Sequence, residues 1–147
     1  MNISGFFDEM SKDRDKAIRN DAVLKYEQDM RQRAVFDLLQ PNRSDWILDI
    51  GCGNARDLRI LMGAGYENIV GIDLSFGMLL EGKKILSENS EKKSMLVAGD
   101  ATQIPLREGF FDKIICSEVI EHIPDYHRVL EEIFRLLVPG GKLIVTT

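Results

Sequence analysis

Three aspartates and a pair of glycines in this sequence have the types and spacing of a small-ligand site. Asp49 and Asp73 each stand at the end of a short apolar run, and Asp100 follows a third run. Gly51 and Gly53 come directly after the first run, where a backbone without Cβ atoms can take positive φ and approach a ligand closely. Asp73 lies 22 residues after Gly51, near the offset of about 20 at which an acid accepts hydrogen bonds from ribose hydroxyls. Together these residues predict a site for a nucleoside-containing ligand.

A second group that could do chemistry is Glu118, Glu121 and His122, spaced i, i+3 and i+4. One helical turn would aim all three side chains toward the same ligand. His122 could act as a general base for an oxygen acceptor, because an unperturbed imidazole with a pKa of about 6.5 is mostly neutral at pH 7. Three candidate ligands on one turn do not complete a coordination set, so we favour ligand contacts here over a bound metal.

The elements that would position these residues are strands that alternate with helices. The last helix shows clean amphipathic spacing from Val129 to Leu137 and is predicted to stop at Pro139 to Gly141. Such alternation predicts an α/β fold, a Rossmann-like doubly wound sheet of five mainly parallel strands in the order 3-2-1-4-5, with helices on both faces and the ligand at the carboxyl ends of the strands. The predicted strands are 46–50, 69–73, 95–98, 111–116 and 143–145, and the other helices begin near Leu58 and at Phe76, the latter running to Asn89 and weakened by Gly82.

The chain divides into an N-terminal helical segment, 1–43, and a domain, 44–147. Residues 8–20 are almost all polar and are read as a solvated helix or a lead-in. A stripe of apolar residues at four-residue intervals then predicts an amphipathic helix that ends before Pro41 and packs on the sheet edge. The stripe is Tyr26, Met30, Ala34 and Leu38, with Val35 and Leu39 beside it.

Composition counts against several classes of protein. Residues 1–43 carry equal numbers of basic and acidic side chains, so the net charge of −5 belongs to residues 44–147. The sequence has no stripe of basic residues that would neutralise phosphates, so a nucleic-acid partner is not expected. No apolar run approaches the roughly 20 residues that span a bilayer, so no membrane partner is expected. Cys52 and Cys116 stand far from any metal or redox spacing, which predicts reduced thiols. We therefore expect a cytoplasmic protein.

The glycine loop distinguishes between nucleoside ligands. A dinucleotide site needs a third glycine where this chain has Arg56, which points away from NAD and from an oxidoreductase. The chain resembles the class I S-adenosylmethionine-dependent methyltransferases over roughly 44–147. Five segments carry the resemblance: Leu48 to Gly53, Gly71 to Ser75, Gly99 to Ala101, Phe111 to Cys116 and Leu136 to Gly141. That family often has a further glycine where this chain has Ala55, a small change that should be tolerated.

The resemblance implies a role for each strand-end residue. The backbone of the loop Gly51, Cys52 and Gly53 would hold the methionine part of S-adenosylmethionine, with Asp49 and Glu118 near its ammonium group.

The nucleoside part of the cofactor would bind at the next two strand ends. Asp73 would accept hydrogen bonds from both ribose hydroxyls, and Leu74 would lie against the adenine. The Asp100 carboxylate and the Ala101 N–H would meet the polar edge of the adenine.

The implied activity is methyl transfer to an unidentified small-molecule acceptor. A hydroxyl is one candidate for the acceptor group, and His122 would then be the catalytic base. The pattern of Glu118, Glu121 and His122 resembles a segment of quinone-type O-methyltransferases and the metal-binding segment of RNA 2′-O-methyltransferases. A metal-dependent RNA 2′-O-methyltransferase is therefore one alternative, and a non-catalytic S-adenosylmethionine-binding or partner-binding module is another.

The fifth predicted strand lacks the neighbour that the seven-stranded family sheet implies. The resemblance therefore predicts a truncated family member that is poorly active alone. The open edge of this strand is expected either to self-associate or to be buried against the N-terminal segment.

Overall fold

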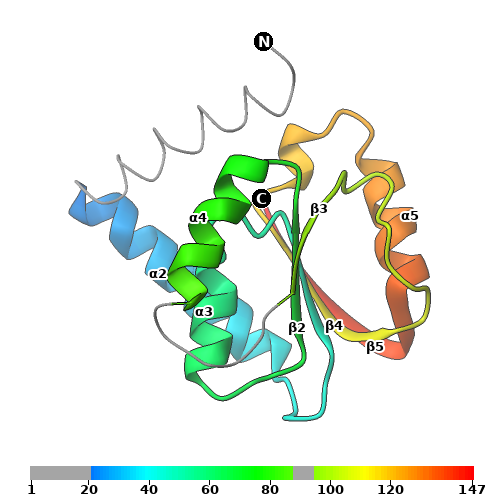
Figure 1. The fold of residues 1–147 in the computed structure, drawn as a ribbon, viewed down its shortest axis with the longest axis horizontal. Helices are drawn as coiled ribbons and strands as arrows, with labels where there is room; N and C mark the ends of the chain where they lie inside the picture. The colour runs from blue at the N-terminus through cyan, green and yellow to red at the C-terminus, as the bar shows by residue number, and fades with distance from the viewer. Residues whose placement is uncertain (1–20, 88–94) are drawn as a thin grey trace.

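The computed structural model describes residues 21–87 and 95–147, which form a five-stranded sheet flanked by helices (Figure 1). The strand order is β3-β2-β1-β4-β5, and every neighbouring pair is parallel. Parallel neighbours need crossover connections, which the intervening helices supply. The predicted fold class and strand order are therefore confirmed. The strands are β1 (Ile47–Ile50), β2 (Ile69–Asp73), β3 (Met95–Ala98), β4 (Phe111–Ser117) and β5 (Leu137–Thr146).

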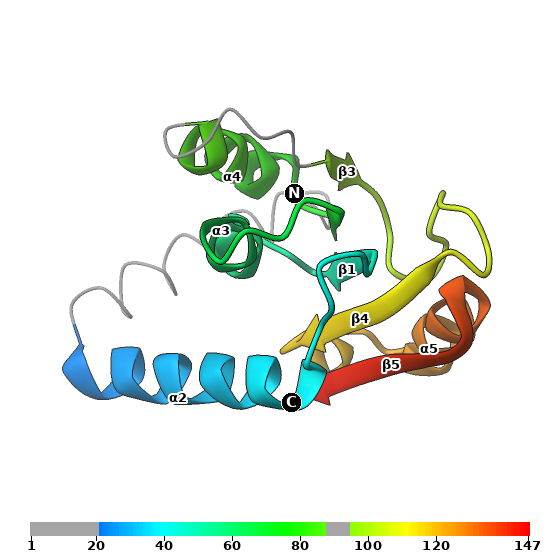
Figure 2. The same ribbon diagram turned by 90° about the horizontal axis from the view of Figure 1, so that it is seen from below.

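The helices cover both faces of the sheet (Figure 2). α2, α3 and α4 pack with one face, whereas α5 and the short 3-10 helix η1 pack with the other. Side chains alternate along a strand, so Ile47 joins the first cluster while Leu48 and Ile50 join the second. The helices are α2 (Ala22–Leu39), α3 (Arg56–Gly63), α4 (Phe76–Ser87), η1 (Ile120–His122) and α5 (Tyr126–Leu136).

α2 ends at Leu39, before Pro41 as predicted, but only part of its predicted apolar face is buried. Tyr26, Met30 and Leu38 from the predicted stripe are 65%, 46% and 61% exposed, whereas Val35 and Leu39 are 2% and 0% exposed. The N-terminal end of α2 projects past the sheet, so only its C-terminal half reaches the core (Figure 2). The periodicity of the helix could not show which of its two neighbouring apolar rows would meet the sheet.

α5 ends at Leu136, before Pro139 to Gly141 as predicted. The predicted start of the last strand, however, is wrong, because Pro139 to Gly141 lies inside β5 instead of forming a turn before it. The pairing of β4 with β5 shifts between Phe111 and Lys113, so β5 carries extra residues there as a bulge. Pairing with β4 on both sides of this bulge outweighs the preference of Pro139 to Gly141 for a turn. Gly140 adopts the left-handed φ of +81° that the bulge requires.

β5 is an edge strand of the described sheet, as expected from the sequence. α2 contacts β5, and Lys142 Nζ donates a hydrogen bond to the Leu38 carbonyl at 3.0 Å. The strand nevertheless stays half exposed from residue 141 to 146. Burial against the N-terminal segment is thus present in part, and self-association stays a prediction.

Some predictions fall outside the described residues. These are the polar segment 8–20 and the end of the helix predicted to reach Asn89. The division of the chain at residue 43 stays a prediction. Within the described ranges, no helix is both long and apolar enough to cross a membrane.

Candidate functional site

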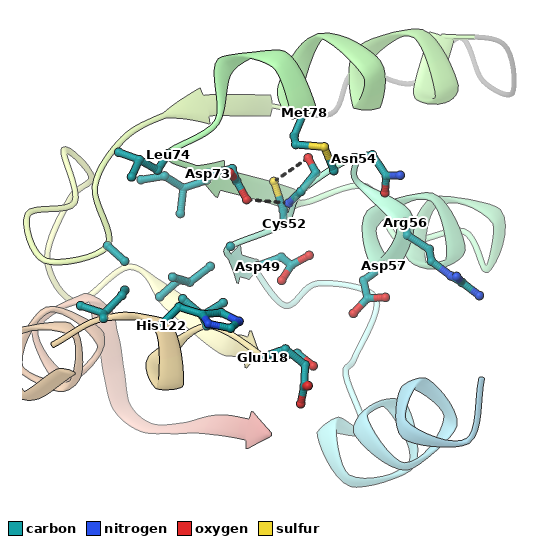
Figure 3. A pocket seen from close by; sticks show the side chains of 18 of the residues that line it. Asp49, Cys52, Asn54, Arg56, Asp57, Asp73, Leu74, Met78, Glu118 and His122 are labelled. Atoms are coloured by element: carbon teal, nitrogen blue, oxygen red, sulfur yellow. Dashed lines mark hydrogen bonds between the residues drawn. The ribbon is translucent and has the colours of Figure 1, made fainter. Parts of the chain in front are cut away.

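The loop that follows β1 is held against the end of β2 by its own backbone. Gly51 and Gly53 take φ values of +72° and +51°, as the glycine pair predicted. The N–H of Gly51 donates to the Ile72 carbonyl at 2.8 Å, and the N–H of Gly53 donates to Oδ2 of Asp73 at 2.7 Å (Figure 3). The loop and the acid at the end of β2, which lie 20 residues apart in sequence, are therefore one unit.

Close packing around this loop leaves no room for extra carbon atoms. A Cβ built on Gly51 would overlap Cγ2 of Val119, and one on Gly71 would lie 2.7 Å from Sγ of Cys52. A Cβ on Gly82 would lie 3.0 Å from the Cβ of Ala55. Gly82 thus lets α4 approach the loop, a reason for this glycine that the sequence did not show.

Ala55 stands where the family often has glycine, and it takes the left-handed conformation with φ of +60°. An L-residue there costs about 1–2 kcal/mol. The Ala55 side chain is fully buried in the cluster with α3 and α4, so packing of its methyl group offsets part of that cost.

A cavity of about 410 Å³ opens at the carboxyl ends of the strands (Figure 3). Residues from the ends of β1, β2 and β4 and from the segment after β3 line it, as expected for the ligand edge of a doubly wound sheet. All ten residues predicted from the sequence line this one cavity: Asp49, Gly51, Cys52, Gly53, Asp73, Leu74, Asp100, Ala101, Glu118 and His122.

Asp49 is the most unusual acid of the site, because it is only 4% exposed. Burial, together with the nearby charges of Asp57 and Asp73, raises the pKa of Asp49 well above its ordinary value. A cation placed beside Asp49 would favour its charged form and lower that pKa again. The site therefore favours a ligand with a positively charged group near Asp49.

The two thiols are buried and unreactive. Burial raises the pKa of Cys52, and burial together with Asp49 raises the pKa of Cys116 to about 12. The thiolate is the reactive form of cysteine, and it is scarce at neutral pH for both residues. Neither thiol is suited to act as a nucleophile.

The acid at the end of β2 and the acid after β3 are oriented by neighbouring N–H and hydroxyl groups. Oδ1 of Asp73 accepts the Ser75 N–H at 2.8 Å, besides the Gly53 N–H on Oδ2. Oδ1 of Asp100 accepts both the N–H and the hydroxyl of Thr102 at 2.8 Å. Thr102 also lines the cavity, although no motif in the sequence selects it.

The prediction that one helical turn aims Glu118, Glu121 and His122 together is wrong. Glu118 has a left-handed φ of +57° and precedes η1, so it does not share that turn. Glu118 and His122 line the cavity, but Glu121 does not. His122 Nε2 lies 3.8 Å from Oε1 of Glu121. Among the described residues, no group of three or more His, Cys, Asp or Glu side chains could hold a metal ion.

Helix α2 adds a set of residues that sequence reasoning missed: Gln28, Arg31 and Gln32 line the cavity. Arg31 forms an ion pair with Glu118 at 3.3 Å, and Gln32 donates to the carboxylate of Asp57. No spacing in the sequence signals these contacts, because only the tertiary structure brings α2 beside α3 and the end of β4.

The fold, the glycine loop and the strand-end acids define the class I S-adenosylmethionine-dependent methyltransferases. The chain belongs to this family, since residues 48–145 match the family described as "Methyltransferase domain". The resemblance stated from the sequence is thus confirmed.

Two bacterial relatives share the name demethylmenaquinone methyltransferase. The protein from Lactobacillus johnsonii is 34% identical over 116 residues, which cover 76% of this chain and 47% of the relative. The protein from Lactococcus lactis is 30% identical over 146 residues, which cover 97% of this chain and 56% of the relative. The chain therefore spans about half the length of these relatives.

A solved structure shows the same fold with a named ligand. Phosphoethanolamine N-methyltransferase 2 from Haemonchus contortus, in complex with S-adenosyl-L-methionine, is 26% identical with a TM-score of 0.70. The match covers 78% of this chain and 27% of that protein.

Proposed function

We propose that this chain binds S-adenosylmethionine and transfers its methyl group to a small-molecule acceptor of the quinone type. The observation that carries the proposal is the convergence of ten residues, chosen from the sequence alone, on one cavity of about 410 Å³. The names of the two bacterial relatives support a quinone-type acceptor.

The methionine end of the cofactor fits the region around the glycine loop. The buried Asp49 carboxyl group lies among other acids and is suited to an ammonium group. Glu118 at the end of β4 would add a second negative charge beside that ammonium group. The tight turn at Gly51 and Gly53 lets backbone groups come close to the methionine chain.

The nucleoside end fits the carboxyl ends of β2 and β3. Asp73, oriented by the N–H groups of Gly53 and Ser75, would accept hydrogen bonds from the ribose hydroxyls. Leu74 is 37% exposed and would lie against the adenine. The Asp100 carboxylate and the Ala101 N–H would contact the polar edge of the adenine.

Bound S-adenosylmethionine supplies a methyl group on a sulfonium, and its transfer to a nucleophile leaves the bonding electron pair on sulfur. The chain contributes mainly by holding the two reactants in line, since effective molarity can supply much of the rate. His122 takes the proton of an acceptor hydroxyl, which raises the electron density of the acceptor. Its Nε2 lies 3.8 Å from Glu121 Oε1, so the imidazolium gains a nearby negative charge.

The RNA 2′-O-methyltransferase alternative gains no support from the site. It needs a metal held by the acids around His122, and Glu121 does not line the cavity. We place the reaction in the cytoplasm, because the two cysteines are free and the sequence gives them no redox spacing.

Calorimetry with S-adenosylhomocysteine and NAD tests the proposal. We expect S-adenosylhomocysteine to bind the chain and raise its Tm, and NAD to do neither. Asp73→Ala should weaken S-adenosylhomocysteine binding roughly 10- to 100-fold, because hydrogen bonds to a charged acceptor are lost. Asp37→Ala, an exposed position on α2, is the matched control. Undiminished affinity in Asp73→Ala would show that the ribose site is elsewhere.

A further inference from the structure

The segment between β3 and β4 carries two of the cavity residues, Asp100 and Ala101, and lies beside α5 (Figure 1). Within this segment, the Gln103 N–H donates to the Asp100 carbonyl at 3.0 Å and closes the turn 100–103. Thr102 donates to Oδ1 of Asp100 through its N–H and its hydroxyl, both at 2.8 Å. The direction of the Asp100 carboxylate therefore depends on the conformation of this turn.

The turn 100–103 is held at both of its ends. Before it, the Gly99 N–H donates to the Asp73 carbonyl at the end of β2, at 3.0 Å. After it, both backbone groups of Ile104 bond to side chains of α5. The Ile104 N–H donates to Oε2 of Glu132 at 2.7 Å, and the Ile104 carbonyl accepts from Nη2 of Arg135 at 2.9 Å. The position of the turn is thus set by β2 on one side and by α5 on the other.

Glu132 and Arg135 act as one unit. Nε of Arg135 donates to Oε1 of Glu132 at 2.8 Å, and Nη2 donates to Oε2 at 2.8 Å, a forked arrangement that orients both groups. Nη1 of Arg135 donates to the Leu106 carbonyl at 3.0 Å. The hydrogen bond from Arg135 lowers the pKa of Glu132 below its ordinary value, so this arrangement favours the charged carboxylate.

A second pair on α5 has the same residue types at the same separation in sequence. Nη1 of Arg128 lies 3.6 Å from Oε2 of Glu131, and the two side chains are 63% and 69% exposed. The side chains of Arg135 and Glu132 are 33% and 18% exposed. An ion pair on the surface contributes little to stability. The Glu132–Arg135 pair does more than stabilise the helix, because it binds the backbone that follows the turn.

We propose that Glu132 and Arg135 are positioning residues that hold the turn 100–103 against the adenine of the cofactor and thereby make the site selective for this base. The inference rests on the proposed function, in which the Asp100 carboxylate and the Ala101 N–H contact the polar edge of the adenine. On that edge adenine has an amino donor and a ring-nitrogen acceptor, whereas hypoxanthine has an oxygen acceptor and a ring N–H donor. Hypoxanthine is rejected only while both protein groups are held in place, since a turn that can shift relieves both mismatches.

Two nucleosides that differ only in the base test this role in calorimetric titrations. We expect the parent to bind S-adenosylhomocysteine roughly 10- to 100-fold more tightly than S-inosylhomocysteine. Glu132→Ala should reduce this preference to about threefold or less, because the turn loses its anchor on α5. Glu132→Gln should show an intermediate preference, because its amide oxygen can still accept the Ile104 N–H. Glu131→Ala, the matched control on the same helix, should keep the preference of the parent.

The ratio of the two affinities separates positioning from a merely structural role. A structural role would weaken both nucleosides equally, and an unchanged ratio in Glu132→Ala overturns the proposal. If Glu132→Ala does not fold, the ratio is measured in Glu132→Gln and in Arg135→Lys, which keeps the charge but loses the forked donors. A lower ratio in those variants supports the proposal, and the parent ratio overturns it. A parent chain that binds neither nucleoside refutes the proposed function itself, which is a distinct outcome.

Discussion

Replacing Gly51 by alanine tests how tightly the loop after β1 is built. Gly51 has a φ of +72°, where an L-residue costs about 1–2 kcal/mol. The new Cβ would overlap Cγ2 of Val119, and overpacking of this kind costs about 1–3 kcal/mol. We therefore expect Gly51→Ala to lower the free energy of unfolding by about 2–5 kcal/mol.

Gly109→Ala is the matched control for backbone strain. Gly109 has a φ of +55°, but a Cβ added there would meet nothing within 4 Å, so this variant should lose only about 1–2 kcal/mol. For a chain of this size each kcal/mol corresponds to roughly 3–4 °C of Tm. Urea unfolding of both variants gives the cost of the overlap as the difference between them.

Val119 provides a second check on the same reasoning. If the overlap is real, Gly51→Ala should cost less in a Val119→Ala background than in the parent, which a double-mutant cycle measures. Gly51 and Val119 both line the cavity, so the single variant should also weaken S-adenosylhomocysteine binding. Equal losses in Gly51→Ala and Gly109→Ala, or no coupling to Val119, would refute the packing argument.

Four further predictions follow from the site and the sheet edge. The pKa of Asp49 is raised in the folded chain, so its contribution to stability is present below the ordinary value of 3.8 and is lost as the pH rises above it. The parent should therefore lose stability relative to Asp49→Asn as the pH rises above about 4 in urea titrations, and parallel curves would contradict this. If the proposed methyl transfer to a quinol is correct, His122→Ala should lower its initial rate by about 10²- to 10⁴-fold, while His127→Ala at an exposed position should not. At saturating S-adenosylhomocysteine, Mg²⁺, Mn²⁺ and Zn²⁺ should bind only weakly, and micromolar stoichiometric binding lost in Glu121→Ala would restore the metal-dependent alternative. The edge of β5 should cause concentration-dependent self-association in sedimentation experiments, which a strict monomer at every concentration would rule out.

The order of the sheet and the residues that line the cavity at the strand ends were readable from the sequence, because they depend on local signals. A buried parallel strand shows as a short apolar run, and its end shows as the change to glycine or aspartate, as at Ile50 to Gly51 and at Ile72 to Asp73. Parallel strands bring all their carboxyl ends to one edge, so residues chosen one by one at strand ends necessarily meet.

The contacts of elements whose neighbours are distant in sequence became visible only in the folded chain. The amphipathic pattern of α2 contains two adjacent apolar rows, and contact with the sheet selects Val35 and Leu39 over Tyr26 and Leu38. The same docking brings Arg31 to Glu118, a contact that no spacing encodes.

The two local errors near β4 and β5 have a similar cause. A helical reading of Glu118 to His122 fails because Glu118 is held in a left-handed conformation by Thr146 on β5. The turn signal at Gly140 is overridden because pairing with β4 continues on both sides of it. Sequence patterns report the local preference of a segment. The pairing of β4 with β5 joins segments that are distant in sequence, and its stabilisation outweighs that local preference.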